Sequence, residues 1–258
     1  VSMDKATNRF LLFLAILATP LAAGAFLLAW GAGNQYFDFA PMNDGYVAPR
    51  DIATVIDKTQ QSTVTVYCRV TKNRGSQGTG WSINPSILQV QANNDLTKLM
   101  TNHHVIDDCI DGAGKVTVAK QFKKEVPAEI LYYDKKNDLA VLETKISMKP
   151  IELSDSYLWP GYWVMSLGSA AGYEGSVSFG SVINVLNEDV LISNSISSGN
   201  SGGPLIDNEG NAVGIITWGS DNDDEQFNGA RSLDTFCEKI VKCEFEYEGV
   251  KTWFDYSG

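Results

Sequence analysis

Two regular patterns of apolar residues open the folded part of the chain. The first has the three- and four-residue spacing of a helix and comprises Ile52, Val55, Ile56 and Thr59. Asp51 precedes it as a capping residue, so residues 51–60 are predicted to form a short helix with one apolar face on the domain. The second has the two-residue spacing of a strand: Val64, Val66, Cys68 and Val70 alternate with Thr63, Thr65, Tyr67 and Arg69. It predicts a half-buried strand.

Short β-rich runs follow at close intervals, separated by Gly, Asn, Asp and Pro. The first group comprises residues 80–83, 87–92, 115–122, 128–133 and 139–143. The second group, after Pro150, comprises residues 161–167, 176–185, 190–193, 205–207 and 212–218. A turn at 207–211 should close a hairpin, and residues 232–242 are predicted to form a C-terminal helix. No long amphipathic helix interrupts the strands, so the pattern predicts an all-β fold with two halves.

The N-terminal segment has a different character. No charged residue occurs between residues 10 and 37, and residues 10–33 are long and apolar enough for a membrane-spanning helix. Lys5 and Arg9 precede it, which predicts a cytoplasmic N-terminus and a translocated remainder. A cleaved signal peptide is the alternative, since residues 23–25 offer small side chains for cleavage. The apolar run continues past that point, which favours an uncleaved anchor; Pro20 would bend such a helix without forbidding it.

Composition narrows the class of protein. The chain has 258 residues, of which 44% are hydrophobic, and this is ample for a packed core. Its net charge of −11 argues against a nucleic-acid partner, because no concentrated basic face is available to neutralise phosphates. The acidic run at 221–225 lacks the spaced ligands of an EF-hand calcium site and is interpreted as a solvated loop. We expect no metal site and no cofactor.

Four cysteines, Cys68, Cys109, Cys237 and Cys243, all follow the apolar segment. An even number in a translocated domain favours disulfides, and three pairings are open. A bridge from Cys68 to Cys109 would brace the loop after His104, and one from Cys237 to Cys243 would staple the end of the C-terminal helix. The second bridge requires a break in that helix, because six residues of helical rise separate Cα atoms by about 9 Å. Free buried thiols are the alternative; zinc binding is disfavoured without a Cys-x-x-Cys pair.

The candidate chemistry centres on Ser201, which lies between glycines in Gly-Asn-Ser-Gly-Gly-Pro at 199–204. Such a turn can direct backbone N–H groups at whatever the hydroxyl attacks. A serine nucleophile requires a base and a group that orients the base. The chain has only two histidines, His103 and His104, and Asp138 leads an apolar run as the candidate acid.

Three motifs carry a family resemblance. Thr-Asn-His-His-Val at 101–105, Asn-Asp-Leu-Ala-Val-Leu at 137–142 and Gly-Asn-Ser-Gly-Gly-Pro-Leu at 199–205 occur in this order. Together they resemble the chymotrypsin-fold serine proteases, most closely the HtrA/Deg-like branch of trypsin-like peptidases, over roughly residues 50 to 240. The resemblance implies that His104 is the base, Asp138 the orienting acid and Ser201 the nucleophile. His103 would be a neighbour that faces away from Ser201.

The resemblance also implies the roles of residues around the nucleophile. The N–H groups of Gly199 and Ser201 would form the oxyanion hole. The specificity position maps to Ser195, and the strand that lines the pocket maps to Thr217, Trp218 and Gly219. Without a carboxylate at Ser195, we expect a neutral, apolar P1 residue. Asn200 replaces the Asp of proteases that are activated by propeptide cleavage, so activity should not require N-terminal cleavage.

The fold implied by the resemblance is all-β, with two six-stranded antiparallel β-barrels and the catalytic groups in the cleft between them. With the N-terminal pattern, this divides the chain into six parts. They are a cytoplasmic N-terminus (1–9), a transmembrane helix or signal anchor (10–33), a linker (34–50), the first barrel (51–149), the second barrel (150–232) and a C-terminal helix and tail (233–258). Few residues follow that helix, so we expect no PDZ domain.

These observations predict a trypsin-like serine endopeptidase that acts on protein or peptide substrates. The protease domain would be extracytoplasmic, either periplasmic or extracellular, and anchored to a membrane through the N-terminal helix; cleavage of that segment would make it secreted. The alternative function is that of a catalytically silent homologue, which serves as a structural or regulatory subunit of a membrane complex. Assembly as a homo-oligomer is compatible with either function.

Overall fold

The computed structural model describes residues 19–20, 24–25, 45–89, 95–220 and 227–243. The chain divides into two units, residues 1–44 and 45–258, and the fold described below belongs to the second. The predicted membrane segment at 10–33 lies largely outside the described residues, as does the acidic run at 221–225. Among the helices that are described, none is both long and apolar enough to cross a membrane.

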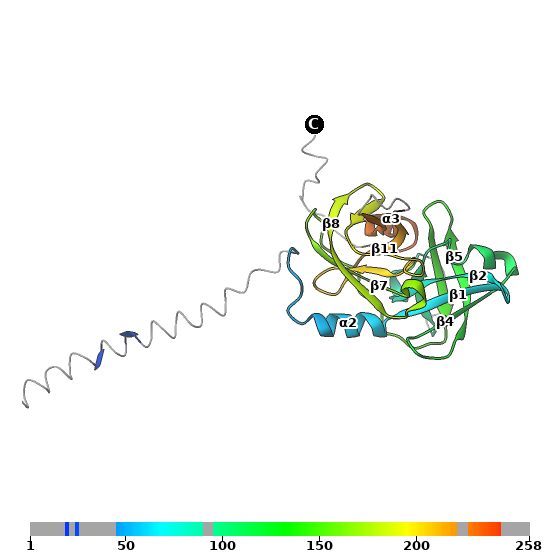
Figure 1. Cartoon of the computed structure of the whole chain (residues 1–258), viewed down its shortest axis with the longest axis horizontal. Coiled ribbons are helices and arrows are strands. Elements are labelled where there is room, and N and C mark those ends of the chain that lie inside the picture. Colours follow the sequence, from blue (N-terminus) through cyan, green and yellow to red (C-terminus); the bar gives the residue numbers. More distant parts are fainter. Residues whose placement is uncertain (1–18, 21–23, 26–44, 90–94, 221–226, 244–258) are drawn as a thin grey trace, which may run out of the picture. The chain divides into compact units, whose positions relative to one another are not determined.

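Two closed antiparallel barrels of six strands each form the second unit (Figure 1). The first barrel consists of β1 (Thr63–Thr71), β2 (Arg74–Ile83), β3 (Thr97–Thr101), β4 (Lys115–Ala119), β5 (Val126–Asp134) and β6 (Leu139–Thr144). The second consists of β7 (Trp163–Gly168), β8 (Ser176–Val185), β9 (Asp189–Ile192), β10 (Pro204–Ile206), β11 (Ala212–Gly219) and β12 (Asn228–Ser232). The strand orders around the barrels are β1-β2-β3-β6-β5-β4 and β10-β11-β12-β9-β8-β7. The prediction of two six-stranded barrels is confirmed.

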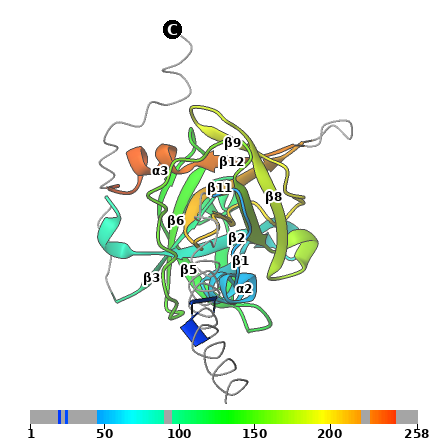
Figure 2. The same ribbon diagram turned by 90° about the vertical axis from the view of Figure 1, so that its left-hand side faces the viewer.

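Short helices flank the barrels. Helix α2 (Ile52–Gln61) precedes β1, and its Asp51 cap accepts a hydrogen bond from the N–H of Thr54 at 3.2 Å, as the sequence predicts. Helix α3 (Leu233–Lys239) follows β12, as Figure 2 shows. It is shorter than the predicted 232–242, and its end before Cys243 allows the disulfide from Cys237 that a continuous helix would prevent.

Several strand predictions were wrong in extent. Residues 87–89 are not a strand: Pro85 and the Asn84 cap start the 3-10 helix η1 (Pro85–Ile87), and Leu88 then makes only an isolated bridge to Val241. The strand predicted at 115–122 ends at Ala119, before a turn. β3 and β12 were not predicted; β12 reads Asn-Gly-Ala-Arg-Ser, without apolar alternation, and is placed by its pairing with β9 and β11.

β1 is more buried than the predicted half-buried strand. Its first four residues are all buried, although Thr63 and Thr65 lie on the polar side of the alternation. The hydroxyl of Thr65 shares a hydrogen bond with that of Ser169 in the second barrel, at 2.6 Å. The polar side of β1 therefore faces protein, and threonines are accommodated there because their hydroxyls are paired.

The core lies in three clusters. One fills the first barrel around Val66, Leu99 and Leu142, and one fills the second barrel around Ile192 and Leu205. The third is shared by the two barrels and α3; it includes Trp81, Met100, Met165, Ile215 and Phe236. Because the third cluster joins the two barrels, it positions the facing residues of the cleft.

Two disulfides close the fold. Cys68 of β1 is bonded to Cys109, with Cα atoms 5.8 Å apart, and Cys237 to Cys243, with Cα atoms 5.3 Å apart. These are the two bridges considered from the sequence. The first holds the 3-10 segment η2 (Asp107–Gly112), which follows His104, against β1.

Candidate active site

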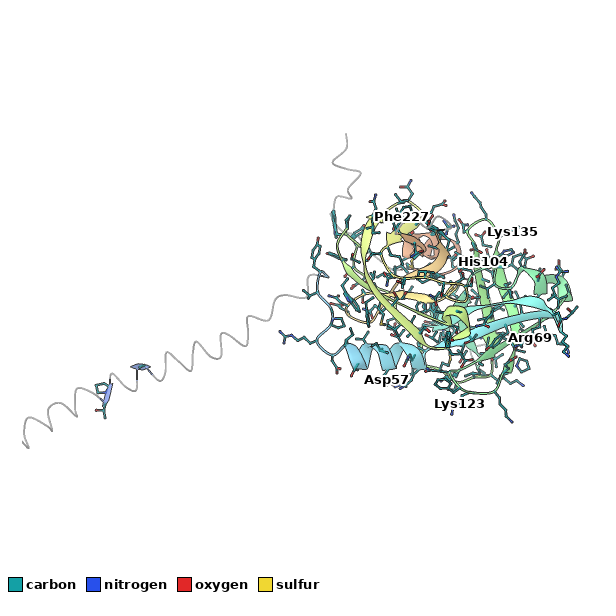
Figure 3. The ribbon with its side chains drawn as sticks, in the orientation of Figure 1. Asp57, Arg69, His104, Lys123, Lys135 and Phe227 are labelled. Atoms are coloured by element: carbon teal, nitrogen blue, oxygen red, sulfur yellow. A yellow bond between two sulfur atoms is a disulfide. The ribbon has the colours of Figure 1, made fainter. Side chains whose placement is uncertain are left out.

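His104 and Asp138 meet in the first barrel where β3 and β6 lie side by side. Nδ1 of His104 is 2.7 Å from Oδ2 of Asp138, and the N–H of His104 donates to Oδ1 at 2.9 Å. The carboxylate thus holds both the ring and the backbone of the histidine. The imidazole remains 47% exposed, and it lies where the two barrels meet (Figure 3). The predicted base and acid are brought together.

A tight turn presents Asp138. The carboxylate of Asp134 accepts the N–H groups of Lys136 at 2.9 Å and Asn137 at 3.1 Å, and also the side-chain amide of Asn137. Burial would raise the pKa of Asp134, but these hydrogen bonds to its charged form outweigh burial and lower it. Asn102 donates to the carbonyl of Asp138 at 2.8 Å from the other side.

His103 faces elsewhere. It is buried, with 4% of its surface exposed, and its Nε2 lies 3.4 Å from a carboxylate oxygen of Asp107. Its ring centroid is 5.5 Å from that of Tyr133. Of the two adjacent histidines, only His104 contacts Asp138.

Ser201 lies on the turn before β10, and the turn requires its glycines. Gly202 has a φ of +84°, and a Cβ there would lie 2.2 Å from the carbonyl oxygen of Thr79. Gly199 has a φ of +96°, and its Cβ would lie 2.2 Å from the carbonyl oxygen of Ser169. In this conformation the Ser201 hydroxyl donates to the carbonyl of Thr217 at 3.5 Å, and not to His104.

The predicted oxyanion donors are unengaged. The N–H groups of Gly199 and Ser201 make no hydrogen bond with any residue in the described part of the chain, whereas those of Asn200, Gly202 and Gly203 do. Neither of these two N–H groups is therefore committed to a partner in the described part of the chain.

Sequence reasoning missed the residues that join the two halves of the site. Thr79 of β2 is fully buried; its N–H donates to the Ser201 carbonyl at 2.8 Å and its hydroxyl to the Gly199 carbonyl at 2.7 Å. Asn102 also donates to the hydroxyl of Thr217 at 3.4 Å. Asn102 lies within the Thr-Asn-His-His motif and could have been singled out, but nothing marks Thr79.

The predicted specificity residues lie on two segments, Ser195 before the Ser201 turn and Thr217 to Gly219 on β11. Ser195 donates its N–H to the hydroxyl of Ser178 at 2.9 Å, and it lines a hollow of about 370 Å³ on the β7–β8 side. Thr217, Trp218 and Gly219 lie at the end of β11. The carbonyl oxygen of Ile196 is 3.9 Å from the position that a Cβ on Gly219 would take.

Asn228 joins the segment at Asn194 to Ser220, the residue that follows β11. Its Nδ2 donates to the carbonyl of Asn194 at 2.6 Å, and its Oδ1 accepts the N–H of Ser220 at 3.1 Å. The same oxygen lies 3.1 Å from the Cβ position of Gly219. A neutral carboxamide thus lies between the two segments, beside Gly219.

No group of three or more metal-binding side chains occurs among the residues described. The chemistry available to the site is that of a hydroxyl, an imidazole, a carboxylate and two backbone N–H groups.

The model of the trypsin-like peptidase domain family matches residues 78–215, more than half of the chain. The chain belongs to this family. A probable periplasmic serine endoprotease DegP-like from Halomonas elongata is 38% identical to this trypsin-like peptidase over 127 residues, which are 45% of the chain and 26% of the relative. The chain thus spans about a quarter of the length of the first curated relatives it matches. The resemblance to HtrA-like proteases is confirmed.

Solved structures agree on the fold of this trypsin-like peptidase. The serine endoprotease from Yersinia pestis matches with a TM-score of 0.62 at 22% identity, over 74% of this chain and 66% of that one. The active form of a protease from M. tuberculosis matches with a TM-score of 0.61 at 22% identity, over 74% of this chain and 86% of that one.

Proposed function

We propose that this chain is a serine endopeptidase that hydrolyses peptide bonds with Ser201 as nucleophile, His104 as base and Asp138 as the orienting acid. The observation that carries the proposal is the two-point contact between Asp138 and His104, at Nδ1 and at the backbone N–H, in a member of a peptidase family. This contact places the proton on Nδ1 and leaves Nε2 as the free acceptor.

In the proposed mechanism, Nε2 of His104 takes the proton of Ser201 as Oγ attacks the substrate carbonyl. The oxyanion that develops accepts hydrogen bonds from the N–H groups of Gly199 and Ser201. The imidazolium, stabilised by the carboxylate of Asp138, returns the proton to the leaving amine, and an acyl-enzyme forms. Water, activated by the same histidine, then attacks the acyl group and releases the acid product and Ser201.

A fluorophosphonate probe tests the proposal directly. The wild-type chain should be labelled at Ser201 and should hydrolyse a fluorogenic peptide with alanine at P1. Ser201→Ala should abolish both readouts, and His104→Ala should strongly reduce them. Ser156→Ala changes an exposed serine outside the proposed site and serves as the matched control. A folded wild-type chain that takes no label and cleaves no peptide would refute the proposal.

One observation favours a second candidate, the catalytically silent homologue acting as a subunit of a membrane complex. The Ser201 hydroxyl donates to Thr217 and not to His104 in this conformation. Catalytic hydrogen bonds are often unformed without substrate, so this contact alone does not separate the two candidates. The same labelling experiment separates the candidates, because a silent homologue takes no label.

We further propose that the peptidase acts outside the cytoplasm on protein or peptide substrates. Two disulfides favour an oxidising compartment, and the relative from Halomonas elongata is described as periplasmic. A membrane anchor at residues 10–33 belongs to this proposal. Intact mass and carbonate extraction of membranes test it: a chain that has lost residues 1–25, or that carbonate releases, is not anchored there.

A further inference from the structure

The turn that carries Ser201 contacts a loop of the second barrel, residues 169–175, which we call the strap. The strap joins β7 to β8 and includes the 3-10 helix η3 (Ala170–Gly172). At its middle, the N–H of Ala171 donates to the carbonyl of Ser198 at 2.7 Å. The close approach of Gly199 to the Ser169 carbonyl brings the same two segments together a second time.

The hydrogen bond from Ala171 sets the direction of a catalytic donor. The carbonyl of Ser198 and the N–H of Gly199 belong to one planar peptide group and point in opposite directions. When Ala171 holds the carbonyl, the N–H of Gly199 is directed away from the strap. If the peptide group turned over, the carbonyl would take the place of the N–H, and an oxyanion would meet a negative dipole.

The strap needs support to hold Ala171 there. Ala171 has a φ of +48°, in the left-handed region that a non-glycine residue occupies at a cost of about 1 to 3 kcal/mol. Ala171 to Tyr173 are exposed, so little packing stabilises the middle of the strap. The conformation therefore depends on how the two ends are fastened.

The first end of the strap is fastened to the first barrel through Ser169. The N–H of Ser169 donates to the hydroxyl of Thr79 at 3.0 Å, and its hydroxyl pairs with that of Thr65 at 2.6 Å. All three residues are buried, so these hydrogen bonds are shielded from water.

The second end is fastened through the carboxylate of Glu174. One oxygen accepts the N–H of Phe122 at 2.7 Å, and the other accepts the hydroxyl of Tyr67 at 3.2 Å. Burial and the charge of Glu174 both raise the pKa of Tyr67, which keeps its hydroxyl a donor. Gln121 and Gln60 add hydrogen bonds to the carbonyls of Glu174, at 3.2 Å, and Gly175, at 2.9 Å.

We propose that Glu174 is a positioning residue for the oxyanion hole. By tying the strap to the first barrel, it holds Ala171 on the Ser198 carbonyl and keeps the N–H of Gly199 directed at the substrate. This inference rests on the proposed function and extends it: the first barrel supplies His104 and Asp138 directly, and it also orients a donor of the second barrel.

Steady-state kinetics of Glu174 variants test the inference. Glu174→Ala should lower kcat on the peptide with alanine at P1 by about tenfold or more, with KM changed less than about twofold, because loss of a whole oxyanion donor costs 10² to 10³ in kcat. Glu174→Gln keeps one acceptor oxygen, so its kcat should lie between those of the wild type and of Glu174→Ala. Glu209→Ala removes an exposed acid from the β10–β11 turn of the same barrel and should change neither constant.

A transition-state analogue separates positioning from a general structural role. The matching peptide boronate places an oxygen in the oxyanion hole, whereas the product peptide does not fill it in the same way. Boronate affinity should fall with kcat in Glu174→Ala, and product affinity should not. An active wild type with unchanged kcat in Glu174→Ala would overturn this inference alone, as would equal losses of boronate and product affinity. A wild type that neither cleaves nor takes fluorophosphonate would overturn the proposed function and this inference together.

Discussion

Asp138 has a backbone conformation that few non-glycine residues adopt, with a φ of +55°. The residues before it explain how this conformation is held, since the carboxylate of Asp134 collects the N–H groups of Lys136 and Asn137. Asn102 fixes the carbonyl of Asp138 on its other side. The acid of the proposed triad is thus presented by a hydrogen-bonded turn.

The hydrogen bonds that the carboxylate of Asp134 accepts should make the stability of the folded protein depend on pH. The folded-state pKa of Asp134 lies below its ordinary value, so its contribution is present above about pH 3.9 and is lost as the pH falls through the folded pKa. Asp134→Ala should therefore melt at a lower temperature than wild type near pH 7, and the difference should shrink towards pH 2.5.

Melting temperatures across this pH range check the prediction, with Asp155→Ala, an exposed aspartate outside the turn, as the control. Activity near neutral pH should also fall in Asp134→Ala, because Asp138 loses its support. A difference in melting temperature that stays constant from pH 7 to pH 2.5 would contradict the assignment.

At this scale, the sequence identified residues that lie in motifs and missed those that act across the fold. His104 and Asp138 were found from short motifs, and the structure places them in contact. Thr79 and Glu174 could not be found, because their roles depend on which loop of the other barrel faces them. Ser195 was assigned to a specificity pocket from its distance to Ser201 along the chain, and this assignment stays a prediction.

At the scale of elements, apolar alternation predicted the strands whose two faces differ in polarity. β6 and β11, with long apolar runs, were found within one or two residues. β12 was not, because its sequence has no apolar alternation; its Gly229 packs under the indole of Trp218, which lies 2.1 Å from the position that a Cβ would take. The missed strand matters for function, because its first residue is Asn228.

Asn228 should set the size of the P1 residue. Its carboxamide joins the segments at 194 and 220 and lies beside Gly219, on the predicted specificity strand. Asn228→Ala should open space beside Gly219, and kcat/KM for leucine at P1 relative to alanine should rise by about tenfold or more, in the range that a few methylenes contribute in an apolar pocket. A set of fluorogenic peptides that differ only at P1 measures this ratio.

Asn228→Leu has a similar volume without the hydrogen bonds and should keep the preference for a small P1 residue. Peptides with arginine at P1 should remain poor substrates of every variant, because an unpaired guanidinium would be buried. If Asn228→Ala leaves the preference among P1 residues unchanged, residues other than Asn228 limit the size of the P1 side chain.

At the scale of the whole molecule, the two disulfides should contribute unequally. Cys68 and Cys109 are 41 residues apart in sequence, whereas Cys237 and Cys243 are 6 apart. In the chain-entropy model the longer loop gives the larger stabilisation, within a typical range of about 2 to 4 kcal/mol. Replacing Cys68 and Cys109 by alanine should lower the free energy of unfolding more than replacing Cys237 and Cys243.

Denaturant unfolding of the two double variants measures this order. The first variant should also lose activity, because the bridge holds the segment that follows His104. Equal losses of stability, or the reverse order, would contradict the prediction.

The division of the chain into two halves could be read from the sequence, because each barrel is built from strands that follow one another along the chain. The packing of one half on the other could not, since the shared cluster joins residues such as Trp81 and Phe236, more than a hundred positions apart, whose ring centroids are 6.4 Å apart.

That each barrel uses six consecutive strands bears on the order in which the protein is made. Domains tend to fold in turn from the N-terminus as a chain leaves the ribosome. The first barrel has all its strands once residue 144 has emerged, and it then carries the proposed base and acid without the proposed nucleophile. The second barrel closes only when β12 pairs with β9 and β11. If the proposed function holds, a growing chain would therefore be inactive towards its neighbours until almost all of both barrels has been synthesised.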